Sequence, residues 1–265
     1  MKQYKIGFIG AGNMATAILN GILRSNIFCA DDIIVSDIDA KKLEIIANLG
    51  VSTTNDNKLL LKEADYVVLA IKPQVAGLVL PSLKNDVCDN LFISIMAGLN
   101  KTKLKNMLGD VKLTRVMPNT PCMVSEGMSA VDCLDFNEVS KNVVLNIFKS
   151  IGDVIELDES FFDAVTSVSG SGPAYVYMFI ESMIKGGVLS GLDYETSKRL
   201  ALQTFIGAVK MVRESDLPIE QLISNVCSKG GTTIQAVEYY NDNSLEDIII
   251  GGMKKCEYRS KELSK

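Results

Sequence analysis

The sequence predicts an α/β protein with a doubly wound parallel sheet in its N-terminal part and an all-helical C-terminal part. Short apolar segments alternate with helix-like segments up to residue 117, and only helical periodicity continues after about Asp158. A glycine-rich turn also joins the first apolar segment to the first helix. We place the domain boundary near residue 160, which gives predicted domains 1–160 and 161–265.

The predicted strands of the first domain are short and apolar. They are Lys5–Gly10, Ile33–Asp37, a short strand near Val51, Tyr66–Ile71, Leu91–Ile95 and Leu113–Met117. Helices are predicted at Asn13–Arg24, Ala40–Leu49 and Asn57–Ala64, with further helical stretches between the later strands. This alternation favours right-handed βαβ units and hence a parallel sheet.

Six helices are predicted in the second domain. They are Phe161–Val168, Pro173–Leu189, Glu195–Arg213, Ile219–Val226, Gly231–Tyr240 and Ser244–Leu263. The helix Pro173–Leu189 is apolar on nearly every side, and such a helix needs cover all round. We expect it either in a bundle core or against a second subunit.

Composition excludes several classes of function. The net charge is −5 and no basic stripe is present, which argues against nucleic acid or a membrane surface as partner. With no long uncharged apolar run and no signal-peptide pattern, we expect a cytoplasmic protein. The 6 cysteines lie far apart and favour free thiols over disulfides or a zinc site. The absence of histidine removes the usual acid/base of many dehydrogenases, and we expect no metal.

The segment Gly10–Ala15 (GAGNMA) has the form G-x-G-x-x-G/A between the first strand and the first helix. Gly10 permits the tight turn, Gly12 lets the backbone approach a pyrophosphate, and Ala15 allows close packing of helix and strand. The helix N-terminus then faces the phosphates. The segment therefore predicts a Rossmann-like domain that binds a nicotinamide dinucleotide.

The preference between NADPH and NADH stays open at this point. Asp37, at the end of the second strand, is placed to accept a hydrogen bond from the adenosine 2′-OH, which favours NADH. A solvated acid in a turn is the alternative interpretation. Lys41 and Lys42 follow closely and could instead neutralise the 2′-phosphate of NADPH.

Five segments, taken together, resemble those of Δ1-pyrroline-5-carboxylate reductases. They are Phe8–Ala15 (FIGAGNMA), Ala70–Gln74 (AIKPQ), Met117–Pro121 (MPNTP), Val168–Tyr175 (VSGSGPAY) and Gly230–Ile234 (GGTTI). The resemblance implies reduction of the cyclic imine Δ1-pyrroline-5-carboxylate to L-proline by hydride from NAD(P)H, the last step of proline biosynthesis. It leans to NADPH as cofactor, and it implies a homodimer or higher homo-oligomer formed through the helical domain.

The resemblance also implies a set of cofactor contacts. These are Ile9, Gly10, Ala11, Gly12, Asn13, Met14, Asn57, Ala70, Ile71, Lys72, Pro73, Met96, Ala97 and Gly98, to which the strand argument adds Asp37. Asn57 would lie near the adenosine ribose, although it also suits the N-cap of the helix that it opens. Lys72 could be a solvated charge at a strand end, but Pro73 after it indicates a fixed loop.

The expected substrate loop is Ser228–Thr233. Backbone amides of Gly230, Gly231, Thr232 and Thr233 at a helix start suit a carboxylate, whereas the alternative is a glycine turn with a threonine N-cap. We expect Thr233 to hydrogen-bond the ring nitrogen and to be the catalytic residue. Lys229 stands where the family usually has proline.

Two further positions follow from the resemblance. Asp216 stands where relatives commonly carry Glu near the substrate amine, with a surface turn acid as the alternative. Ser171-Gly172-Pro173 first indicates a helix start, with Ser171 as the cap and Pro173 in the first turn. The resemblance places this segment beside the reaction centre.

Two rival functions remain at the sequence level. β-Hydroxyacid dehydrogenases combine the same kinds of domain, but their catalytic Lys with Asn one turn later is not reproduced by Lys185 and Leu189. A non-catalytic redox sensor would bind dinucleotide without turnover. The retained substrate loop argues against that sensor.

Overall fold

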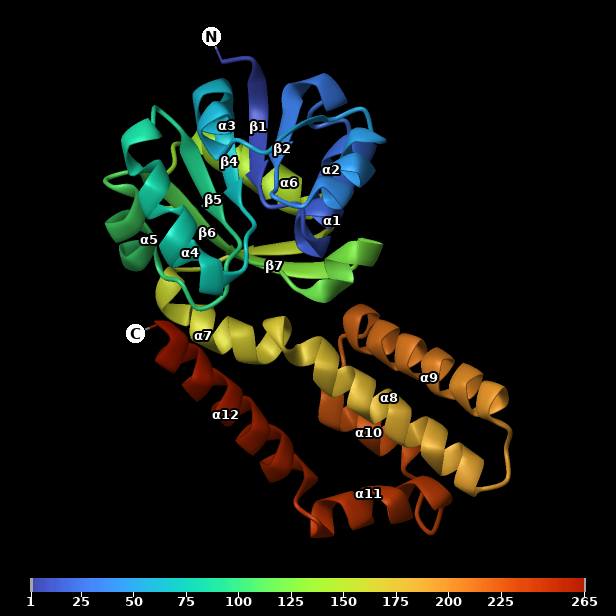
Figure 1. Ribbon diagram of the computed structural model, residues 1–265. Coiled ribbons are helices and arrows are strands. Elements are labelled where there is room, and N and C mark those ends of the chain that lie inside the picture. The colour runs from blue at the N-terminus through green and yellow to red at the C-terminus, as the bar shows by residue number, and fades with distance from the viewer. Residues whose placement is uncertain (1, 265) are drawn as a thin grey trace. The chain divides into compact units, whose positions relative to one another are not determined.

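The computed structural model describes residues 2–264 and divides them into two compact units (Figure 1). The first unit runs to Ser171 and resumes at Cys256, and the second unit is Gly172–Lys255. The last turns of the final helix therefore belong to the first unit. The domain limits 1–160 and 161–265 stay predictions.

The first unit is built on an 8-stranded sheet of order β3-β2-β1-β4-β5-β6-β7-β8. The strands are β1 Tyr4–Ile9, β2 Ile33–Ser36, β3 Ser52–Thr54, β4 Ala64–Leu69, β5 Leu91–Ser94, β6 Lys112–Met117, β7 Gly127–Asp132 and β8 Gly152–Glu156. The strand order turns back between β1 and β4, and ligands of such sheets bind at that switch point, outside the carboxyl ends of the strands. The predicted doubly wound fold is confirmed.

One pair of neighbouring strands departs from the predicted parallel arrangement. β7 runs antiparallel to β6, with Arg115 opposite Asp132, while the other pairs are parallel. The link 118–126 has 9 residues, which is too short for a crossover back to the start of the sheet. The sequence analysis also assigned no strand to β7 or β8, whose small and charged residues give no clear apolar run.

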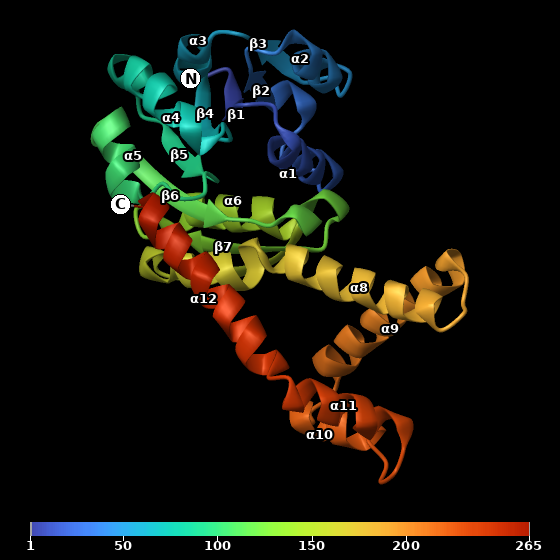
Figure 2. The same ribbon diagram turned by 60° about the horizontal axis from the view of Figure 1, so that its bottom comes forward.

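Helices cover both faces of the sheet (Figures 1 and 2). One face packs against α1 Asn13–Arg24, α2 Ala40–Ala47 and α6 Glu138–Lys149, and the other against α3 Asn57–Glu63, α4 Pro73–Val79 and α5 Lys101–Leu108. Side chains alternate between the faces along each strand, so Val68 joins the first cluster and Val67 the second. The two apolar clusters pack the sheet from both faces and so hold the carboxyl ends of its strands in place.

The chain leaves the sheet through α7 Phe162–Val165 and a π-helical turn, Thr166–Gly170, which we call the π-turn. Short 3₁₀ turns at Ala30–Asp32, Pro81–Asp86, Thr120–Val124 and Glu159–Phe161 complete the connections. The end of α12 Leu245–Ser264 returns to this region. Ser260 Oγ donates to Asp163 Oδ1 at 2.5 Å, and Asn100 Nδ2 donates to the Ser264 carbonyl at 3.2 Å. These bonds fasten the end of α12 to α7 and to the start of α5.

The second unit is helical. It contains α8 Gly172–Leu189, α9 Tyr194–Glu214, α10 Ile219–Val226, α11 Thr232–Asp242 and the first part of α12, and α8 packs along α9 (Figure 1). Ile184 is the buried residue of α8, whereas most of its large apolar side chains are exposed, among them Met178 at 69%. A bundle core is therefore the wrong explanation for this apolar helix in the single chain, and a second subunit is the alternative that remains.

All 6 cysteines are free, as expected for thiols rather than disulfides. Burial raises the pKa of the Cys122 and Cys133 thiols, which keeps these two core residues unreactive. Within residues 2–264, no helix is long and apolar enough to cross a bilayer.

Candidate active site

The glycine loop at the end of β1 has the conformation that its sequence predicts. Gly10 has φ +106°, and a side chain there would place Cβ 2.7 Å from the Ala70 carbonyl oxygen. Its N–H donates to the Ser36 carbonyl at 2.7 Å. The loop therefore crosses tightly between β2 and the end of β4, and only glycine fits at this point.

Gly12 lies at the start of α1 with open space beside it. It is the N-cap residue of α1, its φ is −79°, and an added Cβ would meet nothing within 4 Å. In the described part of the chain no side chain caps α1, and its first turn carries no acid. Free N–H groups and the positive end of the helix dipole thus face open space, as an anion site requires.

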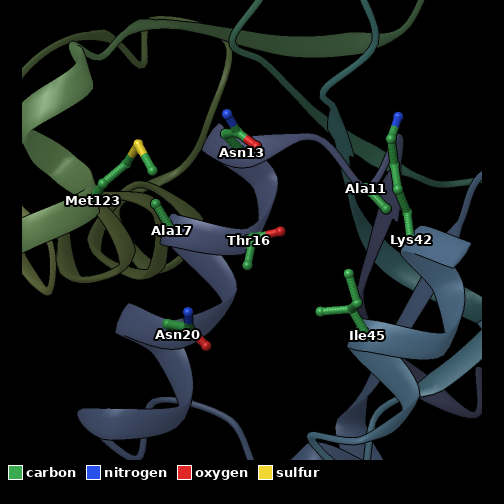
Figure 3. A pocket seen from close by; sticks show the side chains of 8 residues that line it. All are labelled: Ala11, Asn13, Thr16, Ala17, Asn20, Lys42, Ile45 and Met123. Carbon is green, nitrogen blue, oxygen red and sulfur yellow. The ribbon is translucent and has the colours of Figure 1, made fainter.

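A cavity of about 290 Å³ opens beside this helix start. It is lined by Ala11, Asn13, Thr16, Ala17, Asn20, Lys42, Ile45 and Met123. Figure 3 shows Thr16 of α1 pointing across it toward Lys42 and Ile45 of α2. Ala11 and Asn13 were expected at the site, whereas Thr16, Asn20 and Met123 were not, because their positions follow from how α1 packs and not from a motif.

The Asp37 side chain is hydrogen-bonded to the glycine loop. Its Oδ2 accepts from the Ala11 N–H at 2.7 Å, and its Oδ1 accepts from the Asp39 N–H at 2.9 Å. Lys42 Nζ lies 3.8 Å from Oδ2, and the carboxylate is only 11% exposed. The interpretation as a solvated turn acid is therefore wrong, and contact of Asp37 with a cofactor stays a prediction.

Asn57 does not cap α3. Asp56 is the N-cap residue, and its Oδ1 accepts from the N–H groups of Lys58 and Leu59 at 2.8 and 3.2 Å. Asn57 Oδ1 instead accepts from Ser36 Oγ at 2.7 Å. The N-cap alternative is therefore wrong, and the bond to Ser36 ties Asn57 to the end of β2, beside the glycine loop.

The predicted loops after β4 and β5 lie at the same edge of the sheet. The Ala70 N–H donates to the Ile9 carbonyl at 2.9 Å, which joins the β1 and β4 ends. Lys72 is exposed at the N-cap of α4, and Pro73 occupies the first turn of that helix. Pro73 therefore fixes the backbone just after this exposed loop.

The loop after β5 is Met96–Gly98. Met96 is buried, Ala97 is exposed, and Gly98 has φ +74°. A Cβ on Gly98 would stand 3.1 Å from Leu263 Cβ, so the end of α12 packs directly on this loop. The sequence gives no signal for that contact, because the two residues lie at opposite ends of the chain.

The predicted substrate loop in the second unit has the geometry of an anion site. Gly230 has φ +71°, and the Gly231 N–H donates to the Ser228 carbonyl at 2.9 Å. Gly231 is the N-cap residue of α11 with φ −79° and ψ 175°, the same values as at Gly12, and no described side chain caps the helix. Thr232 and Thr233 are exposed in its first turn. The threonine N-cap alternative is therefore wrong.

The predictions for Asp216 and Ser171 compare differently with the structure. Asp216 is exposed in the link between α9 and α10, and its substrate role stays a prediction. Ser171 does not begin a separate helix, because its N–H donates to the Thr166 carbonyl at 2.8 Å and continues the π-turn into α8. The N-cap prediction for Ser171 is therefore wrong, while Pro173 does lie in the first turn of α8.

The sheet, the switch point and the glycine loop define a Rossmann-type dinucleotide-binding protein, here with a helical second unit. Residues 159–263 match the family model for pyrroline-5-carboxylate reductase dimerisation, and residues 5–98 match that for NADP oxidoreductase, coenzyme F420-dependent. The chain belongs to the pyrroline-5-carboxylate reductase family.

Relatives support this over the full length. The chain is 36% identical to the pyrroline-5-carboxylate reductase of Methanosarcina acetivorans, covering 100% of both chains, and 34% identical to that of Arabidopsis thaliana, covering 99% and 96%. The pyrroline carboxylate reductase structure of Plasmodium falciparum with NADP bound has a TM-score of 0.91 at 37% identity, covering 100% of both chains. A 3-hydroxyisobutyrate dehydrogenase from Mycobacterium tuberculosis, at 13% identity and TM-score 0.52, shares the fold alone, covering 72% of this chain and 67% of that one.

Proposed function

We propose that this protein reduces Δ1-pyrroline-5-carboxylate to L-proline with NADPH as the hydride donor. One observation carries the proposal: the chain holds two glycine-led helix starts, at Gly12 and Gly231, that no described side chain caps. The first suits a pyrophosphate and the second a carboxylate. The full-length likeness to pyrroline-5-carboxylate reductases supplies the substrate.

The reaction explains why no histidine is needed. The protonated substrate is an iminium ion, and its C=N carbon, which becomes C5 of proline, accepts hydride without further activation. NADPH bound at the glycine loop would supply the hydride. The electron pair of the C=N double bond becomes the nitrogen lone pair, so the product is a secondary amine, which takes a proton from water. The protein therefore needs to orient the reactants more than to supply a strong acid.

The residues of the first unit fit the dinucleotide. In this proposal the backbone of Ile9, Gly10, Ala11, Gly12, Asn13 and Met14 holds the pyrophosphate. Asp37 and Asn57 lie on the adenosine side, because both are bonded at the end of β2 or beside it. The loops Ala70–Pro73 and Met96–Gly98 lie on the nicotinamide side of the switch point.

The substrate loop supplies the other half of the chemistry. Backbone N–H groups of Gly230, Gly231 and Thr232 grip the carboxylate, and the Thr233 hydroxyl accepts a hydrogen bond from the ring N–H. Asp216 lies near the ring nitrogen in this arrangement. Together these contacts would fix the orientation of the substrate ring.

The cofactor and the assembly follow from the family. NADPH is preferred over NADH, in keeping with the NADP oxidoreductase match and the NADP-bound relative. In this proposal the protein is a homo-oligomer that covers the exposed apolar side of α8, in keeping with the dimerisation match. Its expected location is the cytoplasm. Lys185, the position relevant to the hydroxyacid dehydrogenase rival, pairs with Glu181 at 3.2 Å on an exposed surface, which gives that rival no support.

The test compares proline formation by the native protein with that of Thr233→Ala and Thr233→Ser. At saturating substrate we expect T233A to lose about tenfold or more in turnover, because one transition-state hydrogen bond is removed, and T233S to retain more activity than T233A. Proline is quantified after a timed reaction. Nearly full turnover by T233A would remove Thr233 from the mechanism, and no proline from the native protein would refute the function.

A further inference from the structure

The side chain of Asn119 ties together three segments of the first unit. Its Nδ2 donates to the Ser169 carbonyl in the π-turn at 3.1 Å, and its Oδ1 accepts from the Met128 N–H at the start of β7 at 2.9 Å. Asn119 itself follows β6 and is only 9% exposed. It does not cap the adjacent turn Thr120–Val124 with its side chain.

Ser169 needs a donor from outside the helix for a reason visible in the sequence. In an α-helix the N–H of residue 173 would donate to the carbonyl of residue 169. Residue 173 is proline and has no N–H. Ser169 is half-buried, where an unpaired carbonyl is costly, and Asn119 supplies the donor that Pro173 cannot.

The π-turn lies at the carboxyl edge of the sheet. A Cβ on Gly170 would be 2.6 Å from Met117 Cε, so the turn rests directly on the last residue of β6. β6 lies beyond β4 and β5 from the switch point, on the side opposite to β2 and β3. In sheets of this kind the half of the dinucleotide away from the adenosine lies over those strands. The π-turn therefore borders the nicotinamide half of the proposed site.

We propose that Asn119 is a positioning residue for hydride transfer: by supplying the donor that Pro173 lacks, it holds the π-turn against the nicotinamide half of the site. This rests on the function proposed above. It assigns no contact between Asn119 and either reactant. If the Asn119–Ser169 hydrogen bond is lost, we expect the π-turn to move or become more flexible. The reacting atoms would then be less well aligned.

The test is a double-mutant cycle of Asn119→Ala and Pro173→Ala, read as kcat and KM for NADPH. We expect N119A to lower kcat about tenfold, with the KM for NADPH within about twofold of its native value. In the P173A background the restored N–H can serve Ser169, so N119A should lower kcat by about twofold or less. An equal loss of kcat in both backgrounds would overturn the proposal.

A second readout separates this proposal from the proposed function. Hydrogen exchange of the Ser171 amide, which closes the π-turn, should speed up in N119A and slow again in the double variant. This holds whether or not the protein turns over the imine. If N119A does not fold, Asn119→Asp serves instead, because it keeps an acceptor for Met128 and removes the donor to Ser169. Unchanged exchange at Ser171 in every variant would contradict the proposal even if kcat fell.

Discussion

At the scale of single residues, Gly10 and Gly12 of the glycine loop are expected to be needed for different reasons. Gly10 is fixed by the fold, since its φ is +106° and the Ala70 carbonyl occupies the space of a side chain. Gly12 has an extended backbone and free space, so the fold itself does not require glycine there. In the proposed function, glycine is needed at position 12 because a phosphate approaches the helix start.

These glycines give a matched pair of variants. Gly10→Ala should lower the free energy of unfolding by about 2–4 kcal/mol, because it combines backbone strain with a clash. Gly12→Ala should change that free energy by less than about 1 kcal/mol but weaken NADPH binding by tenfold or more. Denaturant unfolding and fluorescence titration measure the two effects. Native-like NADPH affinity in G12A would show that the phosphates bind elsewhere.

Asp37 is a second residue whose role the structure narrows. Because its Oδ2 accepts from the Ala11 N–H, Asp37→Ala should loosen the loop and weaken NADPH and NADH binding by similar factors, within about threefold of each other. Asp37→Asn is the control, since its amide oxygen can still accept. A loss confined to NADH, measured by titration with both cofactors, would instead make Asp37 the ribose receptor.

Prediction from the sequence succeeded at positions where the backbone conformation determines which residue type fits. A glycine with positive φ after the first strand can be predicted, because few alternatives fit a tight turn there. The hydrogen-bond partners of polar side chains could not be predicted in the same way. Asp56 and Asn57 both suit an N-cap, and only the tertiary contact of Asn57 with Ser36 shows which residue takes that role. Asn119 lies in one of the five segments that carry the resemblance, but its hydrogen bonds could not be predicted, because its partners Met128 and Ser169 lie 9 and 50 positions away.

At the scale of secondary-structure elements, α8 is a helix whose apolar side chains are not covered by the rest of its own chain. An 18-residue helix with most of its large apolar side chains exposed is not stable in water without cover. This helix could be predicted from its apolar composition, and the match to the dimerisation model indicates that a second subunit covers it. By contrast β7 and β8 escaped prediction, since a strand that pairs through small residues has no strong periodic pattern.

A charge on α8 tests the subunit contact. Met178→Glu places a carboxylate on the exposed apolar side, so we expect the oligomer to dissociate to monomers at micromolar concentration. Glu181→Gln, on the same helix, is the control and should leave the mass unchanged. Light scattering coupled to gel filtration gives the mass. An oligomer in M178E as stable as the native one would place the interface elsewhere.

At the scale of the whole molecule, the fold was predictable from the alternation of apolar and helix-like segments, and the family from the resemblance of five short segments taken together. The joint use of the two glycine-led helix starts could not be predicted from the sequence, because the two units carry them separately. A Rossmann unit alone serves many reactions. The substrate assignment therefore depends on the helical unit and its glycine-led helix α11.

The most direct test is the rate of NADPH oxidation by the purified protein with Δ1-pyrroline-5-carboxylate, with NADH and with 3-hydroxyisobutyrate plus NADP⁺ as comparisons. We expect rapid oxidation of NADPH that yields L-proline in equal amount, a lower kcat/KM with NADH, and no reaction of the hydroxyacid. NADPH labelled with deuterium at the transferred position of C4 should leave its label at C5 of proline. Tight NADPH binding with no oxidation in the presence of the imine would contradict the account and leave only a dinucleotide-binding protein.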